Sequence, residues 1–524
     1  MFKRWHEAEI DGARSATPHF CPPQLRLSIV FALFVVAFGV RLYEITDPPM
    51  DFHPVRQYHG ALLARAFYYE RLETAPTWKA EIARLNGQQE GRLEPPILEG
   101  LAAIGYWLGG DERLWIPRVL SVMIWLAGGA FVYLIGVRFG GFEGAIIGTA
   151  CFLLMPFGIH ASRSFQPEPM MVTLLLGSVY AMVRLHETPS SSWWVVAGGS
   201  AAAAVFVKPV SLFVILAVFC SLTYATQGFR KGAVHVLLFA AVLLPSVAYY
   251  LSYLQNPDSI LRMQAESSFQ PHLLLRSDFW KMWVKHVHGT VGLTMTCIAV
   301  AGAFIVPNYR YRAAITGMWV GYLCFGAAFS YYIATHSYYQ LQLVPIISIS
   351  LVPVADMIVG HAARLNRRSR PALAGMWGLA LVSSILCVGL YVHERKNLRL
   401  SYTTIADADK EVSIISQIGN LVDRGARTVI LAKAPESVKY HGHVVGAYWP
   451  SRSELSGAME GDARQATQER FRRLVEGEAA QYFIITDIPE FEQQPFLRDI
   501  LEGSYSVAGR SAEYVVYRLS SDSD

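Results

Sequence analysis

Eleven apolar runs, each close to the length that crosses a lipid bilayer, dominate this sequence of 524 residues. A membrane-spanning helix needs roughly 20 mostly apolar residues. The runs that reach or approach this length are 25–43, 115–137, 142–160, 167–185, 193–207, 209–226, 233–253, 289–306, 313–334, 338–359 and 372–392. Another apolar segment, 96–109, is too short to cross and is typical of an interfacial or re-entrant helix. The pattern predicts an α-helical polytopic membrane protein with about eleven transmembrane helices.

Charged residues are sparse in the first three quarters of the chain and ordinary in the last quarter. Asp, Glu, Lys and Arg make up 16% of the whole chain, against about 25% in a soluble domain. Residues 400–524 contain 32 of them, 13 basic and 19 acidic, and the first 399 residues contain 54. This distribution excludes a single soluble globule, a disordered chain and a basic nucleic-acid-binding protein.

The tail, residues 400–524, alternates helical and strand-like segments. Helices are expected at 405–423, 462–476 and 490–502, and strands at 428–432, 482–486 and 514–518. This order predicts a small C-terminal α/β domain. It follows a transmembrane module over residues 25–395, which is preceded by a polar segment over residues 1–24.

Basic residues beside the predicted spans set the expected orientation, because they favour the cytoplasmic side. Compact clusters occur before the first span and in alternate loops after it: Lys3, Arg4, Arg14 and Arg26; Arg138; Arg184; Arg230 and Lys231; Arg310 and Arg312; and Arg364, Arg367, Arg368 and Arg370. The N-terminus is therefore predicted to be cytoplasmic, with the first span retained rather than cleaved. Eleven spans then place the C-terminal domain, and the long loops 44–114 and 254–288, on the periplasmic or extracellular side of the cytoplasmic (inner) membrane.

Four loops predicted on that outer side carry ionisable and aromatic side chains at the membrane edge. They hold Asp51 and His53; Arg163 and Glu168; Lys208; and His336, Tyr338 and Tyr339. Charges at a membrane edge are costly, so each is a candidate functional residue.

Each of these residues also has a purely structural explanation. Asp51 could cap a helix, Glu168 could stabilise a helix start, and Arg163 and Lys208 could anchor the chain at lipid headgroups. His336 could be a core histidine, and the two tyrosines could belong to an aromatic belt. Their common side of the membrane is what favours a functional site.

The tail offers only a weak metal-ligand pattern. His441 and His443 are separated by one residue, and no third ligand at the spacing of a metal site accompanies them. We assign no metal and no other cofactor, with a divalent metal kept as an alternative.

An outer carboxylate beside cations suits the transfer of a sugar from a lipid-phosphate-linked donor. Cations would hold the phosphate, which stays charged as the leaving group. A carboxylate would accept the proton of the acceptor hydroxyl during attack on the anomeric carbon. Soluble nucleotide sugars are not expected outside the cytoplasmic membrane, and the sequence holds no nucleotide-binding signature.

The sequence also resembles the GT-C superfamily of polyprenyl-phosphate-sugar-dependent glycosyltransferases. The resemblance covers roughly residues 25–395 and is closest to the branch of dolichyl-phosphate-mannose–protein mannosyltransferases and lipid A aminoarabinose transferases (family 39-like). The motifs that carry it are Asp51 followed by Tyr58 and Ala64-Arg65, Glu94-Pro95-Pro96, Ser162-Arg163-x-x-x-Pro167-Glu168-x-x-Met171, Lys208-Pro209, and His336-Ser-Tyr338-Tyr339-Gln-Leu-x-Leu-Val-Pro345. No single motif identifies the superfamily; their order, their spacing and their common predicted side of the membrane together are more specific.

The resemblance implies an inverting transferase with roles for particular residues. Asp51 would be the catalytic base, and Glu168 would orient the acceptor or the base. The donor phosphate would be held by Lys208, Arg163 and Arg56, and the substrates would be lined by His53, Tyr58, Glu94, His336, Tyr338 and Tyr339. Many relatives carry an Asp-Glu pair where this chain has Asp51 and Phe52, so the group that assists Asp51 is left open.

The predicted partners are a polyprenyl-phosphate sugar, an acceptor that is a cell-envelope glycan, a lipid or a protein, and the lipid bilayer. The transferred group would be a hexose or a pentose. The alternative is a transporter or flippase of a lipid-linked sugar, which would require polar residues deep in the spans. A non-catalytic receptor whose tail binds polysaccharide is a third class.

Overall fold

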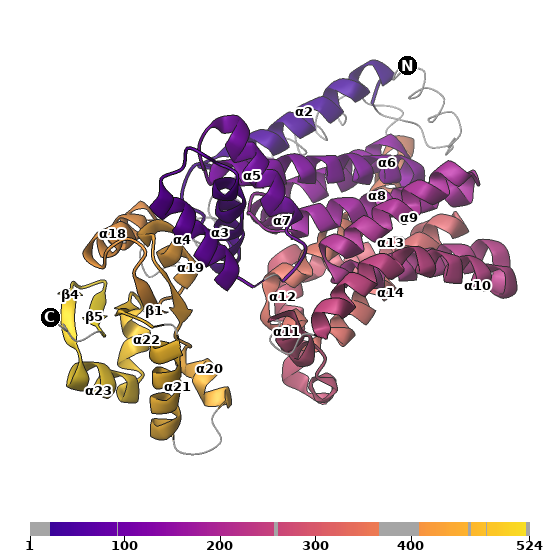
Figure 1. Cartoon of the computed structure of the whole chain (residues 1–524). Helices are drawn as coiled ribbons and strands as arrows, with labels where there is room; N and C mark the ends of the chain where they lie inside the picture. Colours follow the sequence, from indigo (N-terminus) through magenta and orange to yellow (C-terminus); the bar gives the residue numbers. More distant parts are fainter. Residues whose placement is uncertain are drawn as a thin grey trace.

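The computed structural model describes residues 21–91, 93–255, 260–365, 408–458, 463–477 and 479–519 (Figure 1). The helices before the tail are α2 (Pro23–Leu42), α3 (Pro54–Glu70), α4 (Thr77–Gln89), α5 (Ile97–Gly109), α6 (Trp115–Leu154), α7 (Pro156–Ser162), α8 (Glu168–Glu187), α9 (Ser191–Val207), α10 (Leu212–Leu254), α11 (Ile260–Ser268), α12 (Ser277–Val291), α13 (Leu293–Ile305), α14 (Tyr309–Ala328), α15 (Ser330–Thr335) and α16 (Leu343–Leu365). Short 3₁₀ turns are η1 (Pro209–Ser211), η2 (Pro271–Leu275) and η3 (Ser337–Gln342).

The two longest helices fold back on themselves at a glycine. Gly141 in α6 has φ 80° and Gly228 in α10 has φ 72°, a left-handed conformation that glycine adopts without steric cost. A Cβ on Gly136 would lie 2.9 Å from the Cα of Ala145, whereas a straight helix would separate these residues by about 14 Å. The two arms of α6 therefore correspond to the runs predicted at 115–137 and 142–160. Gly232 likewise lies against Tyr224 across the break in α10.

Within the described residues, five helices are long and apolar enough to cross a membrane, or six when a bent pair is counted as one span. That pair, α12 and α13, bends by 88° at Gly292, whose φ is 79°. Because α13 has 13 residues, it is about 20 Å long and shorter than the hydrocarbon core. The run predicted at 289–306 therefore corresponds mainly to α13, which is shorter than the predicted span.

The chain is a multi-pass helical membrane protein. The predicted span 372–392 lies outside the described residues, and the count of eleven stays a prediction.

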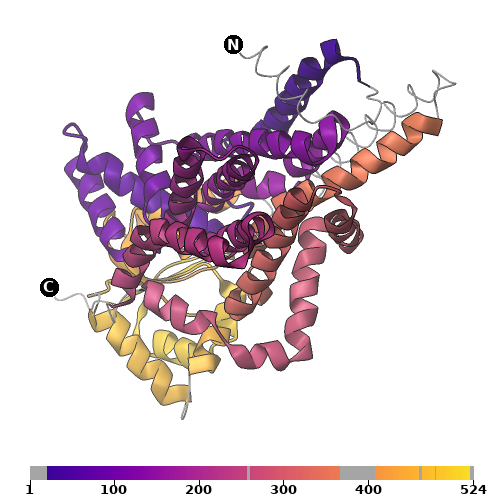
Figure 2. The ribbon, with the colours of Figure 1, turned by 90° about the vertical axis from the view of Figure 1, so that its right-hand side faces the viewer.

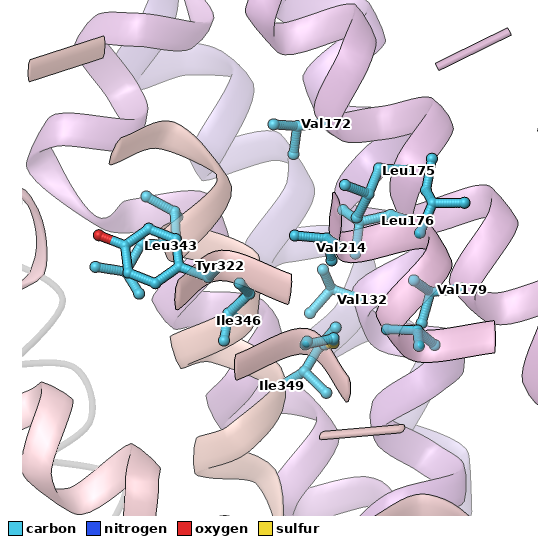
Figure 3. Packing of buried hydrophobic residues seen from close by; sticks show 14 of the residues in the cluster. Val132, Val172, Leu175, Leu176, Val179, Val214, Tyr322, Leu343, Ile346 and Ile349 are labelled. Atoms are coloured by element: carbon cyan, nitrogen blue, oxygen red, sulfur yellow. The ribbon is translucent and has the colours of Figure 1, made fainter. Parts of the chain in front are cut away.

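The membrane module is held together by close packing of α6, α8, α10 and α16. Val132, Val172, Val214 and Ile346 meet in its buried core (Figure 3). Small residues let the backbones approach: a Cβ on Gly148 of α6 would lie 2.7 Å from the Ser348 carbonyl oxygen of α16. Because lipid is as apolar as these side chains, the hydrophobic effect does not drive the helices together, and close van der Waals packing stabilises the module instead.

The tail folds as a five-stranded sheet with the order β2-β1-β3-β5-β4. Its elements are α18 (Ala408–Leu421), β1 (Arg427–Leu431), α19 (Pro435–Gly442), β2 (Val445–Tyr448), α20 (Arg452–Ala458), α21 (Ala463–Gly477), β3 (Tyr482–Ile485), α22 (Ile488–Glu492), α23 (Pro495–Ser504), β4 (Ser506–Arg510) and β5 (Val515–Arg518). Strands β2, β1 and β3 run parallel to one another, and β5 is antiparallel to both of its neighbours, β3 and β4. The helix expected over 490–502 is split, because Pro495 lacks the N–H of a helix interior and starts α23 instead.

Alternate residues of the strands face two separate apolar layers. Ile430 and Ile484 pack with α18 and α19, whereas Leu431 and Phe483 pack with α21 and α23. This is the two-residue period of a strand that is covered on both faces.

The C-terminal domain packs on the loop between α2 and α6, beside α3 and α4 (Figure 1). The Lys439 ammonium of α19 lies 3.0 Å from the Glu90 carboxylate, and the Tyr448 hydroxyl donates to the same carboxylate at 2.5 Å. Arg65 donates to the Tyr440 carbonyl at 2.7 Å and lies over the Tyr440 ring. The tail therefore lies on the same side of the membrane module as residues 44–114, and α16 runs away from it (Figure 2).

Candidate functional site

A strained turn brings the first loop to the mouth of the helical bundle. His53 has φ 48°, which is uncommon for a residue with a side chain, and Pro54 then starts α3. The His53 ring lies edge-on to Tyr338 with centroids 4.8 Å apart, and its Nε2 is 3.1 Å from the Ser337 hydroxyl. Such strain persists where the surrounding structure imposes it, commonly at functional sites.

Four groups of alternating charge form a continuous chain, in which Lys208 and Glu168 are buried and Arg56 and Glu94 are half-buried. Arg56, one turn into α3, donates to both oxygens of Glu94 at 2.9 and 3.0 Å. Lys208, between α9 and η1, lies 3.3 Å from Glu94 and pairs with Glu168, the first residue of α8. Two cations and two carboxylates from four distant segments therefore meet in one place.

Aromatic rings complete this cluster and enclose a small pocket. The Lys208 ammonium lies 5.2 Å from the ring centre of Tyr338 and 5.3 Å from that of Tyr339. The pocket is narrow and is lined by Glu168, Met171, Lys208, Val210, Tyr338, Tyr339 and Gln342. It combines a cation, aromatic faces and an apolar wall.

The electrostatics of the cluster fix its charge states. Burial alone would raise the pKa of Glu94, but the charges of Arg56 and Lys208 outweigh it and lower that pKa to about 2. Burial and the nearby His336, Arg56 and Lys208 lower the pKa of His53 to about 3. At neutral pH the Glu94 carboxyl is therefore ionised and the His53 imidazole is neutral.

Asp51 lies in a second, adjacent group. Its side chain is buried, and Arg118 Nη2 donates to Oδ2 at 3.2 Å. Arg118 also donates to the carbonyls of Ile45, Asp47 and Arg163. This arginine therefore holds the whole loop that carries Asp51.

Two other predicted site residues lie away from the pocket wall. Arg163 is fully buried beside Arg118 and donates to the Glu44 carbonyl at 2.9 Å. The Tyr58 hydroxyl lies 2.8 Å from His441 Nε2, in the contact with the C-terminal domain. Among the described residues, no three His, Cys, Asp or Glu side chains are grouped to hold a metal ion.

Comparisons with known proteins match both the sequence and the architecture. The family model of dolichyl-phosphate-mannose-protein mannosyltransferase matches residues 93–251. The crystal structure of ArnT from Cupriavidus metallidurans bound to undecaprenyl phosphate superposes with a TM-score of 0.58 at 14% identity, covering 96% of this chain and 99% of that chain. The chain has the GT-C fold. The apo form of the same ArnT gives a TM-score of 0.56 at 15% identity, covering 93% of this chain and 97% of that chain.

The GT-C likeness extends to a more distant protein. AglB, the oligosaccharyltransferase of Archaeoglobus fulgidus, in complex with an inhibitory peptide and a dolichol-phosphate, gives a TM-score of 0.57 at 10% identity. That alignment covers 95% of this chain and 74% of AglB. A search of curated protein sequences found no match. The resemblance that the sequence motifs indicated is confirmed.

The GT-C family match contains three of the four charges of the cluster. Glu94, Glu168 and Lys208 fall within residues 93–251, and Arg56 precedes them. Sequence reasoning missed Arg118, although it is an arginine near the start of an apolar run. It also missed Gln342, an amide inside the run predicted at 338–359.

Proposed function

We propose that this chain transfers a sugar, a hexose or a pentose, from a polyprenyl-phosphate-linked donor to a hydroxyl of an extracytoplasmic acceptor, with inversion at the anomeric carbon. The observation that carries the proposal is the Lys208 ammonium, buried between two carboxylates and two tyrosine rings in a pocket of the membrane module. ArnT and AglB share the fold; the ArnT structure has undecaprenyl phosphate bound, and the AglB structure is a complex with an inhibitory peptide and a dolichol-phosphate.

The donor phosphate would bind at the cationic end of the pocket. Lys208 and Arg56 carry the positive charge there, and the phosphate oxygens would take the place of part of their contact with Glu94. Charge-assisted hydrogen bonds of this kind stabilise a phosphate as it leaves. The tyrosine rings would pack on the sugar or the first isoprene unit.

Asp51 is the proposed general base. Its carboxylate would accept the proton of the acceptor hydroxyl while that oxygen forms a bond to the anomeric carbon, and the bond from that carbon to the phosphate oxygen breaks. Arg118 would act as a positioning residue by orienting the carboxylate. Glu168 would orient the acceptor or the base.

The acceptor would be a cell-envelope glycan, a lipid or a protein on the periplasmic or extracellular side of the inner membrane. The C-terminal domain would lie there too, because it packs on the loop that holds Asp51 and His53. Its docking makes it a candidate for acceptor recognition.

The test is transfer in proteoliposomes. Mass spectrometry of envelope glycans from cells with and without the protein identifies the modified acceptor, which is then supplied with synthetic undecaprenyl-phosphate sugars. Asp51→Asn should lower the rate of undecaprenyl phosphate release by ~10²–10⁴-fold. Asp111→Asn, which changes an exposed acid of the same outer loop, should leave it unchanged.

Undiminished transfer by Asp51→Asn would remove Asp51 as the base. A wild-type protein that moves intact sugar-linked lipid across the bilayer, without releasing undecaprenyl phosphate, would replace the transferase by a flippase.

A further inference from the structure

Gln342 is a buried residue that lines the pocket of the proposed donor site. It is the last residue of η3, is 2% exposed and lines the pocket with Lys208 and Glu168. Among the described residues, neither its amide oxygen nor its amide nitrogen has a hydrogen-bond partner. Burying an amide without partners costs free energy, so a polar ligand is the natural complement.

A second polar atom in the same pocket is in the same situation. Glu168 is 3% exposed, and its Oε1 pairs with Lys208. Within the described part of the chain, its Oε2 has no hydrogen-bond partner. The pocket therefore offers one amide, which both donates and accepts, and one carboxylate oxygen, which accepts.

This combination fits the hydroxyl groups of a sugar better than a phosphate. A hydroxyl both donates and accepts, as a carboxamide does, whereas a phosphate would meet repulsion from the amide oxygen and from the carboxylate. Lys208 lines the same pocket. Because the sugar is bonded directly to the phosphate, a phosphate at Lys208 places the sugar within reach of Gln342.

We propose that Gln342, beside Glu168, binds ring hydroxyls of the donor sugar and determines which sugar is accepted. The proposal rests on the donor class proposed above. Gln342, which lies outside the charged cluster, would distinguish one pyranose from another.

The structure also supplies a matched control two residues away. Gln340 is fully buried in the same turn, but its amide donates to the Ile333 carbonyl at 2.9 Å and its oxygen accepts from the Tyr322 hydroxyl. Gln340→Met should therefore lower the melting temperature. Gln342→Met breaks no bond within the described residues and should leave the melting temperature unchanged or raise it.

The experiment measures binding to the full chain in lipid nanodiscs. The probes are undecaprenyl phosphate and undecaprenyl phosphate linked to glucose, mannose, galactose or 4-amino-4-deoxyarabinose. Gln342→Met should raise the Kd of the sugar-linked lipid that the wild type prefers by roughly 5- to 30-fold, the loss of one or two hydrogen bonds. The Kd of undecaprenyl phosphate should change by less than about 2-fold.

Each other outcome overturns the inference. An equal loss for both lipids would place Gln342 on the phosphate, and no loss would remove it from the site. Unfolding of Gln342→Met would make the residue structural, and a wild type that does not distinguish the sugar-linked lipids from undecaprenyl phosphate would have no sugar site. A wild type that binds neither kind of lipid would instead refute the proposed donor class itself.

Discussion

The clearest quantitative prediction concerns Glu90, which joins the C-terminal domain to the segment between α2 and α6. Its carboxylate is buried and contacts Lys439 at 3.0 Å, Tyr448 at 2.5 Å and His59 of α3 at 2.8 Å. We expect Glu90→Leu to loosen the domain from α3, the helix whose first turn carries Arg56. The rate of sugar transfer should fall with it.

Glu90→Leu should lower the free energy of unfolding by several kcal/mol. Lys439 is 2% exposed, and removing one partner of a buried ion pair costs about 3–5 kcal/mol. The contacts of Glu90, led by His59 and Lys439, outweigh the effect of burial and lower its pKa to about 2 from 4.5, which corresponds to about 3 kcal/mol. This stability is present above pH 4.5 and is lost as the pH falls towards 2.

The assay is a double-mutant cycle with Glu90→Leu, Lys439→Met and the double variant. Urea unfolding is followed by tryptophan fluorescence, because Trp449 lies in the core of the C-terminal domain. All proteins in the cycle also carry Glu436→Gln, because the nearby Glu436 carboxyl could otherwise ionise and pair with Lys439 when Glu90 is removed. Each single variant should lose about 3 kcal/mol, and the double variant should recover most of the loss because no buried charge is left alone.

Losses below about 1 kcal/mol in both single variants, or strictly additive losses in the double variant, would refute the reasoning. The contact between Glu90 and Lys439 would then be no more than a surface ion pair.

Three further predictions follow from buried groups and close contacts. Burial and the charge of Glu90 raise the pKa of Glu436 to about 8, so this carboxyl holds a proton in the folded protein. The free energy of unfolding should therefore fall by roughly 3–5 kcal/mol between pH 4.5 and 8. Glu436→Gln should flatten this dependence when the melting temperature is measured against pH. Arg118→Ala should cost about 3–5 kcal/mol and abolish transfer, since it removes the hydrogen bonds that Arg118 donates to Asp51 and to three backbone carbonyls. Normal melting and activity would contradict this. Gly302→Ala should lower the melting temperature, because the added Cβ would lie 1.8 Å from the Ser350 carbonyl oxygen. The control Gly289→Ala, which adds a Cβ in open space, should raise the melting temperature slightly. The reverse order would count against the packing of α13 on α16.

The sequence predicted most helices because apolar length is a local property. The runs at 25–43 and 167–185 match α2 and α8 within a few residues. The predicted boundary between the loop 254–288 and the run 289–306 lies close to the bend at Gly292, but the 88° angle depends on the backbone conformation of that glycine, which composition does not reveal. In the tail, α19, β2, α20 and β4 were missed because their segments lack a clear apolar run or period.

For the candidate site, charge in an apolar context was an informative signal. It selected Glu168, Lys208 and Tyr338, which the structure brings together in one pocket. It could not separate them from Arg163, whose contact with a backbone carbonyl is set by tertiary packing. Gln342 was passed over because an uncharged amide differs little in composition from its apolar neighbours.

The docking of α19 on α3 has a consequence for biogenesis. Helix α3, which carries Arg56, is made early in translation. The residues of α19 that hold this region, Lys439 through Glu90 and Tyr440 through Arg65, are made some 380 residues later. Ribosome-bound or truncated chains would insert their spans and still leave α3 unsecured. We therefore expect the pocket to become competent only after the α/β domain has been synthesised and has folded against α3.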